Sequence, residues 1–326
     1  MRRVLVPLAI GGPPLPPPGA RSAIAVLDGR TMGTTWRVRA VVPRGQPVEP
    51  HRAAIEALLA QLVADLSNWE TGSALSCFGR SPLDAWQALP ASLIDVLVAA
   101  RQVHAASGGA FDPTVGPAVA RWGFGPTGSA QRRAGADAGF DAIEIDAERG
   151  RARRRADVSL DLGGIAKGHA VDRLSVCLCA RDAPHHLVEI GGELRGNGVK
   201  PDGLPWWVTL ETPPDDAPVD TTIAALHGLS IATSGDYRHF FHRDGRRHAH
   251  TIDPATGEPV VDAPASVSVL HKHCMLADAE ATAIVVLGVA AGLAYAEARG
   301  LAARVVERTA HGLVVHGTTA FDAMLS

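Results

Sequence analysis

The segment SLDLGGIAKGHAVD, residues 159–172, joins a short strand pattern to a helical pattern through a loop that is rich in glycine. Gly163, Gly164 and Gly168 surround Lys167 in this loop. Glycine lets backbone N–H and C=O groups approach a ligand closely, and the lysine adds a compact positive charge. A phosphate needs such an arrangement, although the spacing matches neither a P-loop nor a dinucleotide-binding fingerprint. By itself the segment is explained equally well as a ligand loop or as a structural turn.

The patterns on both sides of this segment predict an α+β fold with antiparallel sheets flanked by helices. Apolar residues recur at helical spacing over residues 50–66 and 91–106. A hairpin is predicted over residues 143–160, and short strands are predicted at 186–190, 206–211, 229–232 and 266–270. Because strands and helices do not alternate regularly, a doubly wound parallel sheet is not expected.

The composition indicates a protein with a sizeable core and no nucleic-acid partner. Of the 326 residues, 46% are hydrophobic and 20% are charged, which excludes wholesale disorder. The net charge of −3 argues against a polyphosphate partner, because proteins that bind one usually carry a basic excess. There is no internal repeat and no clear linker after residue 22, so residues 23–326 are expected to form one catalytic domain.

Residues 1–22 begin with two arginines and a short apolar stretch that runs into prolines. This pattern predicts a flexible Pro-rich leader rather than a signal peptide. A lipoprotein attachment site is not expected either, so a cytoplasmic location is favoured and a periplasmic one is the alternative. The apolar stretch 281–295 is shorter than the roughly 20 residues of a membrane helix, so no membrane span is expected.

A second candidate site lies in the segment MLADAEAT, residues 275–282. Asp278 and Thr282 are four residues apart at the start of a predicted helix and therefore share one face. A carboxylate and a hydroxyl in this geometry suit Mg²⁺, which prefers oxygen ligands and shares the phosphates of its substrate. The alternative is that Asp278 only caps the helix N-terminus.

Two further loops carry polar or glycine residues. In SGGAFDPT, residues 107–114, Asp112 precedes Pro113, a pair that favours a turn with an exposed carboxylate. The segment GGELRGNG, residues 191–198, is a second glycine-rich turn.

Histidines raise a zinc alternative. The stretch 233–259 contains His239, His242, His248 and His250, and residues 271–274 are HKHC. Histidine is a common zinc ligand, but these spacings match no closed structural zinc site. On a strand, His271 and His273 would point away from Cys274.

Eight segments, taken in chain order, resemble the ApbE family of flavin transferases. They are TMGTTWRV (31–38), LSNWETGSALS (66–76), SGGAFDPTVGPAVARWGFG (107–125), SLDLGGIAKGHAVD (159–172), LVEIGGELRGNG (187–198), TSGDYRHFF (233–241), HTIDPATGEPV (250–260) and ADAEAT (277–282). Each is weak alone, but their common order over about residues 28–290 is very specific. The resemblance implies a single ApbE-like domain that uses FAD and Mg²⁺ to attach FMN to a threonine of an acceptor protein and releases AMP. Acceptors in this family are redox-complex subunits or flavoproteins with a Ser/Thr-rich flavinylation motif.

The resemblance also implies which residues form the site. The metal ligands would be the backbone carbonyl of Ala166 with Asp278 and Thr282, and Lys167 would help to neutralise the pyrophosphate. The FAD contacts would come from Met32, Trp69, Ala110, Phe111, Asp112, His169, Asp172 and His250. Trp69 would stack on the isoalloxazine, and Asp172 with His169 would hold the adenosine end.

A catalytic base is expected because a threonine hydroxyl is a weak nucleophile. We predict His250 as this base, with Asp253 as the alternative or as its orienting partner. Ala74, Gly79 and His169 depart from the family pattern, which has a glutamate, an asparagine and a tyrosine there. Two other functions stay open: an FAD pyrophosphatase that releases free FMN and AMP, and a flavin-binding protein without catalysis.

Overall fold

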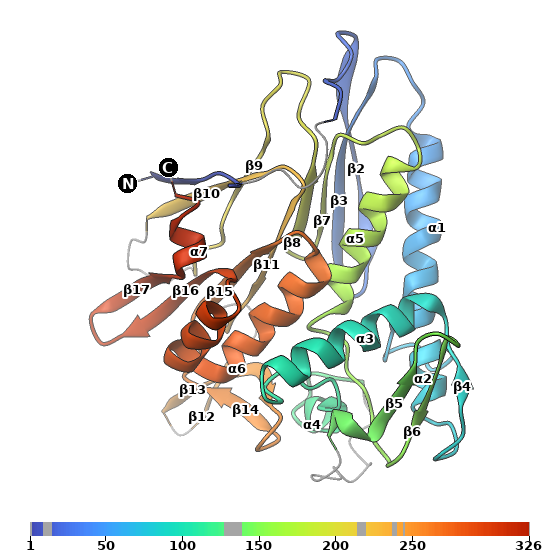
Figure 1. Ribbon diagram of the computed structural model, residues 1–326, viewed down its shortest axis with the longest axis vertical. Coiled ribbons are helices and arrows are strands. Elements are labelled where there is room, and N and C mark those ends of the chain that lie inside the picture. Colours follow the sequence, from blue (N-terminus) through green and yellow to red (C-terminus); the bar gives the residue numbers. More distant parts are fainter. Residues whose placement is uncertain are drawn as a thin grey trace.

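A computed structural model describes residues 2–8, 15–126, 139–213, 220–236, 240–243 and 245–325 of the chain. Within these residues an eight-stranded antiparallel sheet forms the centre of the molecule, in the order β17-β16-β15-β11-β8-β7-β3-β2 (Figure 1). Its strands in chain order are β2 (Ser22–Thr31), β3 (Thr34–Pro43), β7 (His186–Ile190), β8 (Glu193–Asn197), β11 (Leu229–Ser234), β15 (Ser266–His271), β16 (Ala302–Thr309) and β17 (Gly312–Gly317).

Three-stranded sheets surround the central one in the described part of the chain. One contains β1 (Arg2–Leu5), β10 (Thr221–Leu226) and β9 (Trp206–Thr209). Another contains β12 (Phe240–Arg243), β13 (Arg246–Asp253) and β14 (Glu258–Val261). The last contains β4 (Gln87–Ala88), β6 (Arg151–Arg154) and β5 (Ile143–Asp146).

Helices cover one face of the central sheet (Figure 1). They are α1 (Glu49–Leu66), α2 (Ala74–Phe78), α3 (Ala91–Ala106), α4 (Gly116–Arg121), α5 (Ala166–Cys179) and α6 (Cys274–Ala298), with a 3₁₀ turn at Phe140–Ala142. Near the C-terminus, α7 (Thr319–Asp322) packs on the opposite face, where Phe321 joins Leu5 and Trp206. One core lies between β2, β3 and β7 and the helices α1, α3 and α5. A second core lies between α6 and the strands β11, β15 and β16.

Both faces of the central sheet are buried, because successive side chains along each strand point to opposite faces of the sheet. Val267 and Val269 of β15 face α6, whereas Leu270 packs with Leu5 and Trp206 of the β1-β10-β9 sheet. The antiparallel α+β fold predicted from the sequence is therefore confirmed. The helices predicted at 50–66 and 91–106 are α1 and α3, and the predicted hairpin is β5 and β6.

The first residues of the chain differ from the expected flexible leader. Residues Arg2–Leu5 form β1, which pairs in parallel with β10, and Leu5 is fully buried. Further along, the Pro16 carbonyl accepts a hydrogen bond from the His185 ring. The edge of β10 offers unpaired backbone groups and the core offers a place for Leu5, so this segment gains contacts that its composition does not reveal.

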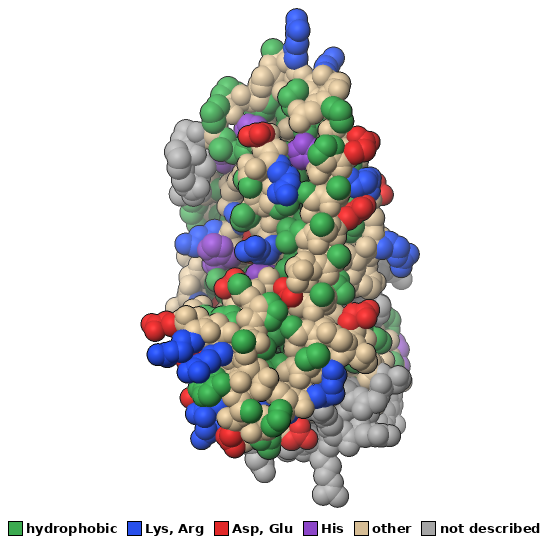
Figure 2. Space-filling model, turned by 90° about the vertical axis from the view of Figure 1, so that its right-hand side faces the viewer, with side chains coloured by type: hydrophobic (Ala, Val, Ile, Leu, Met, Phe, Trp, Pro, Cys, Tyr) green, Lys and Arg blue, Asp and Glu red, His purple; other side chains and the backbone are tan. Residues whose placement is uncertain are grey.

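Acidic residues form ion pairs with the arginines of the β5–β6 hairpin. Arg149 and Arg151 pair with Asp146, Arg153 pairs with Glu144, and Arg154 is buried against the Ser81 and Val158 carbonyls. On this side of the molecule basic and acidic side chains are interspersed across the surface (Figure 2). The hairpin is therefore a locally neutralised surface, which agrees with the absence of a basic excess in the whole chain.

The apolar helix α6 has 25 residues, longer than the apolar stretch recognised in the sequence. By length and composition it could cross a membrane, but half of its most apolar window is buried inside the protein. It contains the buried acidic residues Asp278 and Glu280, and its path breaks at Gly288, where φ is +77°. In this structure α6 is a core helix, and its first turns meet the first turns of α5 (Figure 1).

Candidate active site

The N-terminal turns of α5 and α6 touch backbone to backbone at Gly168. A Cβ atom at this position would lie 2.4 Å from the Cys274 carbonyl oxygen and 2.8 Å from the Met275 Cα. Only glycine allows this approach, and it is one of the glycines that the sequence singled out. The loop 161–168 and the segment 275–282 are therefore brought together as predicted for one site.

Each of these helices is capped by a carboxylate from the other. Neither N-cap residue, Ile165 for α5 and His273 for α6, makes a side-chain capping bond. Instead the Gly168 N–H donates to Asp278 Oδ2 at 3.0 Å, and the Met275 N–H donates to Asp172 Oδ2 at 3.0 Å. Asp278 does cap a helix, but a different one from its own.

Thr282 lies one turn beyond Asp278, on the same face of α6. Its hydroxyl donates to the Asp278 carbonyl at 3.1 Å and lies 3.3 Å from the Ser234 hydroxyl at the end of β11. It also packs directly on Gly164, where an added Cβ would lie 2.7 Å from Thr282 Oγ1. Two groups of α6 whose oxygen atoms can bind a cation, the Asp278 carboxylate and the Thr282 hydroxyl, thus face the glycine turn before α5.

The buried negative charges at this site favour the binding of a cation. Asp278 and Glu193 are each 2% exposed, and Lys167 pairs with Glu193 Oε1. Burial raises the pKa of Asp278, and burial together with the Asp278 charge raises the pKa of Glu193 to about 7, although Lys167 opposes both shifts. Two buried carboxylates share one ammonium group, and Glu193 Oε2 has no hydrogen-bond partner in the described structure. This donor chemistry fits a hard divalent cation.

Glu193 was not recognised as a site residue in the sequence. It follows the glycine pair at 191–192, and a Cβ on Gly191 would lie 3.0 Å from the Thr34 side chain and 3.4 Å from Glu193 Oε2. The glycine turn therefore brings the β2–β3 hairpin beside the Lys167–Glu193 pair. A carboxylate directly after two glycines was the available signal.

Met32 lies at the tip of the β2–β3 hairpin. Thr31 pairs with Thr34, so Met32 and Gly33 form a two-residue turn, with φ values of +47° and +72°. Such a turn needs positive φ at both positions, and a methionine there is strained. Strain of this kind is common at ligand sites, which agrees with the predicted flavin contact without testing it.

Trp69 is held near the glycine loop by its neighbour. The Asn68 side chain donates to Asp161 Oδ2 at 2.8 Å, and the Gly163 N–H donates to Asp161 Oδ1 at 2.7 Å. Burial raises the pKa of Asp161 despite these bonds. The Trp69 side chain itself is 63% exposed, so its indole face is accessible for stacking. The sequence did not single out Asn68 or Asp161.

The Asp112 carboxylate is buried, whereas the sequence predicts an exposed one. Its side chain is 8% exposed and accepts bonds from the Thr114 N–H at 2.7 Å, the Thr114 hydroxyl at 2.6 Å and the Phe140 N–H at 3.2 Å. The carboxylate therefore shapes the turn instead of facing solvent, and Phe111 beside it is also buried. This turn meets the glycine loop, because the Asp161 N–H donates to the Pro113 carbonyl at 2.7 Å. The FAD contacts predicted for Ala110, Phe111 and Asp112 stay predictions.

His169 and Asp172 lie on the first turns of α5. His169 is 3% exposed, its Nε2 has no hydrogen-bond partner among the described residues, and burial beside Arg173 lowers its pKa to about 4. Both Asp172 oxygens are occupied, one by the Met275 N–H and the other by Arg195 Nη1 at 3.2 Å. The predicted contact of Asp172 with adenosine gains no support from these bonds.

His250 lies on β13 beside the end of the 107–125 segment. Its ring meets the Phe124 ring edge-on, with centroids 6.2 Å apart, in a cluster with Phe241, Trp122 and His248. Arg121 Nη2 donates to the Gly257 carbonyl and fixes α4 to the β13–β14 turn. Two segments that are far apart in sequence are thus joined at His250.

Asp253 has a local structural role. Its carboxylate accepts bonds from the Ala255 N–H at 2.9 Å and the Thr256 hydroxyl at 3.2 Å within its own turn. A cavity of about 370 Å³ lies beside it, lined also by Thr256 and Val286. The role of Asp253 as orienting partner of His250 stays a prediction.

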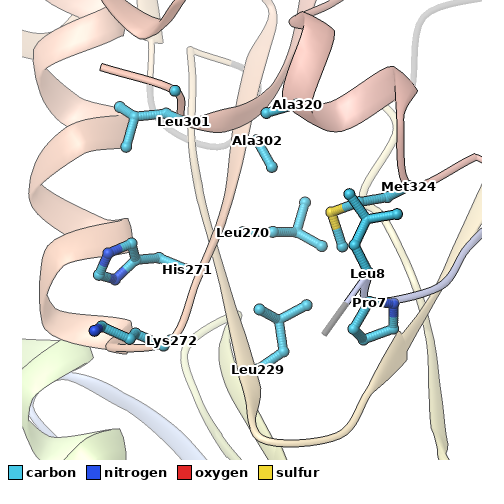
Figure 3. Close-up of a pocket in the computed structure, with 11 residues that line it drawn as sticks. Pro7, Leu8, Leu229, Leu270, His271, Lys272, Leu301, Ala302, Ala320 and Met324 are labelled. Carbon is cyan, nitrogen blue, oxygen red and sulfur yellow. The ribbon is translucent and has the colours of Figure 1, made fainter. Parts of the chain in front are cut away.

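The zinc alternative finds no support in the described residues, where no three His, Cys, Asp or Glu side chains are grouped to hold a metal. His239 lies outside the described residues. Cys274 is fully buried and its Sγ faces the Leu194 carbonyl, away from His271 and His273. A cavity of about 340 Å³ beside His271 and Lys272 is lined mainly by apolar residues such as Leu229, Leu270 and Met324 (Figure 3). None of the predicted site residues lines it.

A lysine, buried carboxylates and two helix N-termini meet in this site, an arrangement typical of enzymes that bind phosphate groups. The chain belongs to the ApbE family, whose family model matches residues 32–305. It is 33% identical over 309 residues to an FAD:protein FMN transferase of Vibrio cholerae, covering 92% of each chain. It is 34% identical over 318 residues to an FAD:protein FMN transferase of Haemophilus influenzae, covering 91% of this chain and 90% of that protein.

Solved structures agree with these relatives. The apo flavinyl transferase ApbE of Pseudomonas stutzeri has a TM-score of 0.84 and 38% identity, covering 93% of this chain and 97% of that one. The flavin transferase ApbE of Vibrio cholerae has a TM-score of 0.83 and 31% identity, covering 93% of this chain and 99% of that one. The chain is thus an FAD:protein FMN transferase, with FAD as flavin donor and a flavoprotein as acceptor.

Proposed function

We propose that this transferase moves FMN from FAD to a threonine hydroxyl of its acceptor, depends on Mg²⁺ and releases AMP. The observation that carries the proposal is the meeting of the α5 and α6 N-termini beside Asp278 and Thr282. Two helix N-termini at one place favour the anionic pyrophosphate of FAD, and the oxygen donors between them favour a hard cation.

The metal ligands would be Asp278, Thr282 and a backbone carbonyl of the glycine turn. The predicted carbonyl of Ala166 lies in the first turn of α5, where the helical hydrogen bond of residue 170 engages it. A carbonyl oxygen with one hydrogen bond keeps a second lone pair for a cation, so Ala166 is proposed as the third ligand beside Asp278 and Thr282. When bound, a divalent cation supplies positive charge beside the phosphoryl oxygens.

In the proposed reaction the threonine Oγ attacks the phosphorus on the FMN side of the pyrophosphate. A new O–P bond forms, the bond from that phosphorus to the bridging oxygen breaks, and AMP leaves with this oxygen. His250 takes the threonine proton, with Asp253 as the alternative acceptor. Lys167 and the backbone N–H groups at the helix N-termini stabilise the negative charge that develops on the phosphates.

The flavin would lie on the other side of the glycine loop. The exposed indole of Trp69 would stack on the isoalloxazine, and Met32 would contact the flavin from the hairpin tip. The 110–112 turn and His169 would line the rest of the dinucleotide site. The contacts Asn68–Asp161 and Asp161–Pro113 support this arrangement, since they hold these segments around one loop.

The test is to incubate the purified protein with FAD, Mg²⁺ and an acceptor domain that carries a Ser/Thr-rich flavinylation motif. Transfer is expected to give a fluorescent acceptor band in a denaturing gel, with AMP released in equal amount and peptide mapping to a threonine. An acceptor with that threonine replaced by alanine is the matched control.

The alternative functions would give other products. Free FMN and AMP without a labelled acceptor would show a pyrophosphatase, and unchanged FAD would show a flavin-binding protein. Full transfer in the presence of EDTA would contradict the proposed metal dependence.

A further inference from the structure

We propose that Asp172 is a positioning residue for the metal site: with Arg195 it fixes the first turn of α6 so that Asp278 and Thr282 face the glycine turn. This inference rests on the proposed function, because it concerns the Mg²⁺ site proposed above. The hydrogen bonds of Asp172 described above lead toward Asp278 through α6.

The contact between Asp172 and α6 is direct. Asp172 Oδ2 accepts from the Met275 N–H, three residues before Asp278 on the same helix. Asp278 in turn accepts from the Gly168 N–H, four residues before Asp172 on α5. The two hydrogen bonds therefore close a loop that contains one turn of each helix. A shift of α6 that lengthened the Asp172 bond would also move the Asp278 carboxylate from the glycine turn.

Arg195 links this loop to the central sheet. From β8 its guanidinium donates to Asp172 Oδ1, to the Ser230 hydroxyl of β11 at 3.1 Å and to the Lys272 carbonyl just before α6. Its Nε also donates to the Ser175 hydroxyl of α5 at 3.2 Å. One side chain thus holds both helices and the loop that leads into α6.

The far end of the network has a single consistent proton arrangement. His186 is fully buried, and burial lowers its pKa to about 4, so it is neutral near pH 7. Its Nδ1–H donates to the Ala183 carbonyl at 2.8 Å, and its Nε2 therefore accepts from the Ser175 hydroxyl at 2.8 Å. The Ser175 oxygen is then free to accept from Arg195. His186 Nδ1, the Ser175 hydroxyl, Arg195 Nε and Arg195 Nη1 each donate within this network, which ends on the Asp172 carboxylate, and such connected hydrogen bonds rigidify a buried region.

Residues that orient metal ligands usually change metal affinity by about 10- to 100-fold when they are replaced. We therefore expect Asp172→Ala to raise the dissociation constant for Mn²⁺, a paramagnetic substitute for Mg²⁺, by at least about 10-fold. Asp172→Asn keeps an oxygen for the Met275 N–H but loses the charge facing Arg195, so a smaller increase is expected. Binding of the metal alone to the whole protein is measured by electron paramagnetic resonance of free Mn²⁺.

Glu280→Gln is the matched control on the same helix. Glu280 is as buried as Asp278, but its partners are Arg299 at 2.9 Å and the Tyr295 hydroxyl at 2.5 Å, away from α5. This variant is expected to lower the melting temperature while its Mn²⁺ affinity stays that of the unmodified protein. If general destabilisation alone lowered the Mn²⁺ affinity, Glu280→Gln would lose affinity as the Asp172 variants do.

Activity gives a second readout. In Asp172→Asn the Mg²⁺ concentration for half-maximal transfer is expected to rise, with kcat largely restored at saturating metal. Unchanged Mn²⁺ affinity in both folded Asp172 variants would overturn the positioning role. If the unmodified protein shows no Mn²⁺ site that Asp278→Asn removes, the metal site of the proposed function fails instead.

Discussion

Asp172 and Asp278 lie on neighbouring helices, and each accepts a hydrogen bond from the backbone at the N-terminus of the helix that carries the other. The exchange is possible because Gly168 lets the two helices meet without side chains between them. It neutralises part of the positive end of both helix dipoles and leaves Asp278 beside Thr282. The stability of the helix pair and the geometry of the proposed metal site therefore depend on the same contacts.

Replacing Asp278 by asparagine should separate activity from folding. The amide oxygen can still accept a hydrogen bond from the Gly168 N–H. The carboxyl group, whose pKa burial raises, is lost together with its negative charge. We expect FMN transfer to fall by about 100-fold or more with a melting temperature within a few degrees of the original. Asp262→Asn, at an exposed pair with Arg246, is the control and should keep full activity. Normal transfer by Asp278→Asn would contradict the metal assignment.

The ion pair of Lys167 and Glu193 should behave unequally when each partner is removed. Lys167→Met leaves two buried carboxylates without their cation and should lower the free energy of unfolding by about 2 kcal/mol at pH 7. Glu193→Gln removes one of these charges and should change stability by less than about 1 kcal/mol. The double variant should recover most of the loss, which urea unfolding of all four proteins can measure. Strictly additive effects would show that the pair is not coupled.

Gly168→Ala tests the close approach of the helices. The new Cβ would meet the Cys274 carbonyl at 2.4 Å, so α6 must move away from α5. We expect a loss of about 1–3 kcal/mol in unfolding free energy and a weaker metal-dependent activity. Gly19→Ala is the matched control, since its Cβ would meet nothing closer than the Ser22 hydroxyl at 3.8 Å. Equal melting temperatures for the two variants would argue against this packing.

Buried histidines should make the protein less stable in acid. Burial lowers the folded-state pKa of His186 to about 4 from the ordinary value of 6.5, so below pH 6.5 the unfolded chain binds a proton that the native state excludes. Stability is therefore lost as the pH falls from about 6.5 toward 4, by about 2–3 kcal/mol for this group near the acid end of that range. Burial also lowers the pKa of His169 to about 4, so this residue likewise destabilises the native state in acid.

The measurement is urea unfolding at pH 7.5 and pH 5, with His186→Gln for comparison. Glutamine can accept from Ser175 without titrating, so the variant should lose less stability in acid than the unmodified protein. The same acid sensitivity in both proteins would assign the effect to other groups.

His250 and Asp253 should have different effects on the chemical step. His250→Ala is expected to lower kcat of FMN transfer by about 10²- to 10⁴-fold, the usual contribution of a general base. Asp253→Ala removes the acceptor of the Ala255 and Thr256 bonds, so it should mainly loosen the β13–β14 turn and cost about 1 kcal/mol of stability. Single-turnover kinetics and thermal unfolding distinguish the two. A larger kinetic defect in Asp253→Ala would make Asp253 the base.

The departures from the family pattern have simple places in the structure. Ala74 is the first residue of α2 and Gly79 is its C-cap, while His169 is buried in α5. Ala74 and Gly79 lie on the segment that also carries Trp69. Their effect on FAD affinity can be measured by restoring the family residues one at a time.

The sequence by itself determined the local structure and the candidate donors. Helical spacing located α1 and α3, and the 278–282 spacing placed Asp278 and Thr282 on one helix face, because these patterns depend only on neighbours along the chain. The order of eight short segments pointed to the family and to most of the residues discussed here.

The tertiary structure decided how these donors are shared. That Asp172 holds α6, that Asp112 is buried in its own turn and that Glu193 joins Lys167 all depend on contacts between distant segments. Likewise, β1 forms only because β10 offers an edge for it. A carboxylate can cap a helix, pair with a cation or bind a metal, and the partner that packing brings within about 3 Å decides which of these it does.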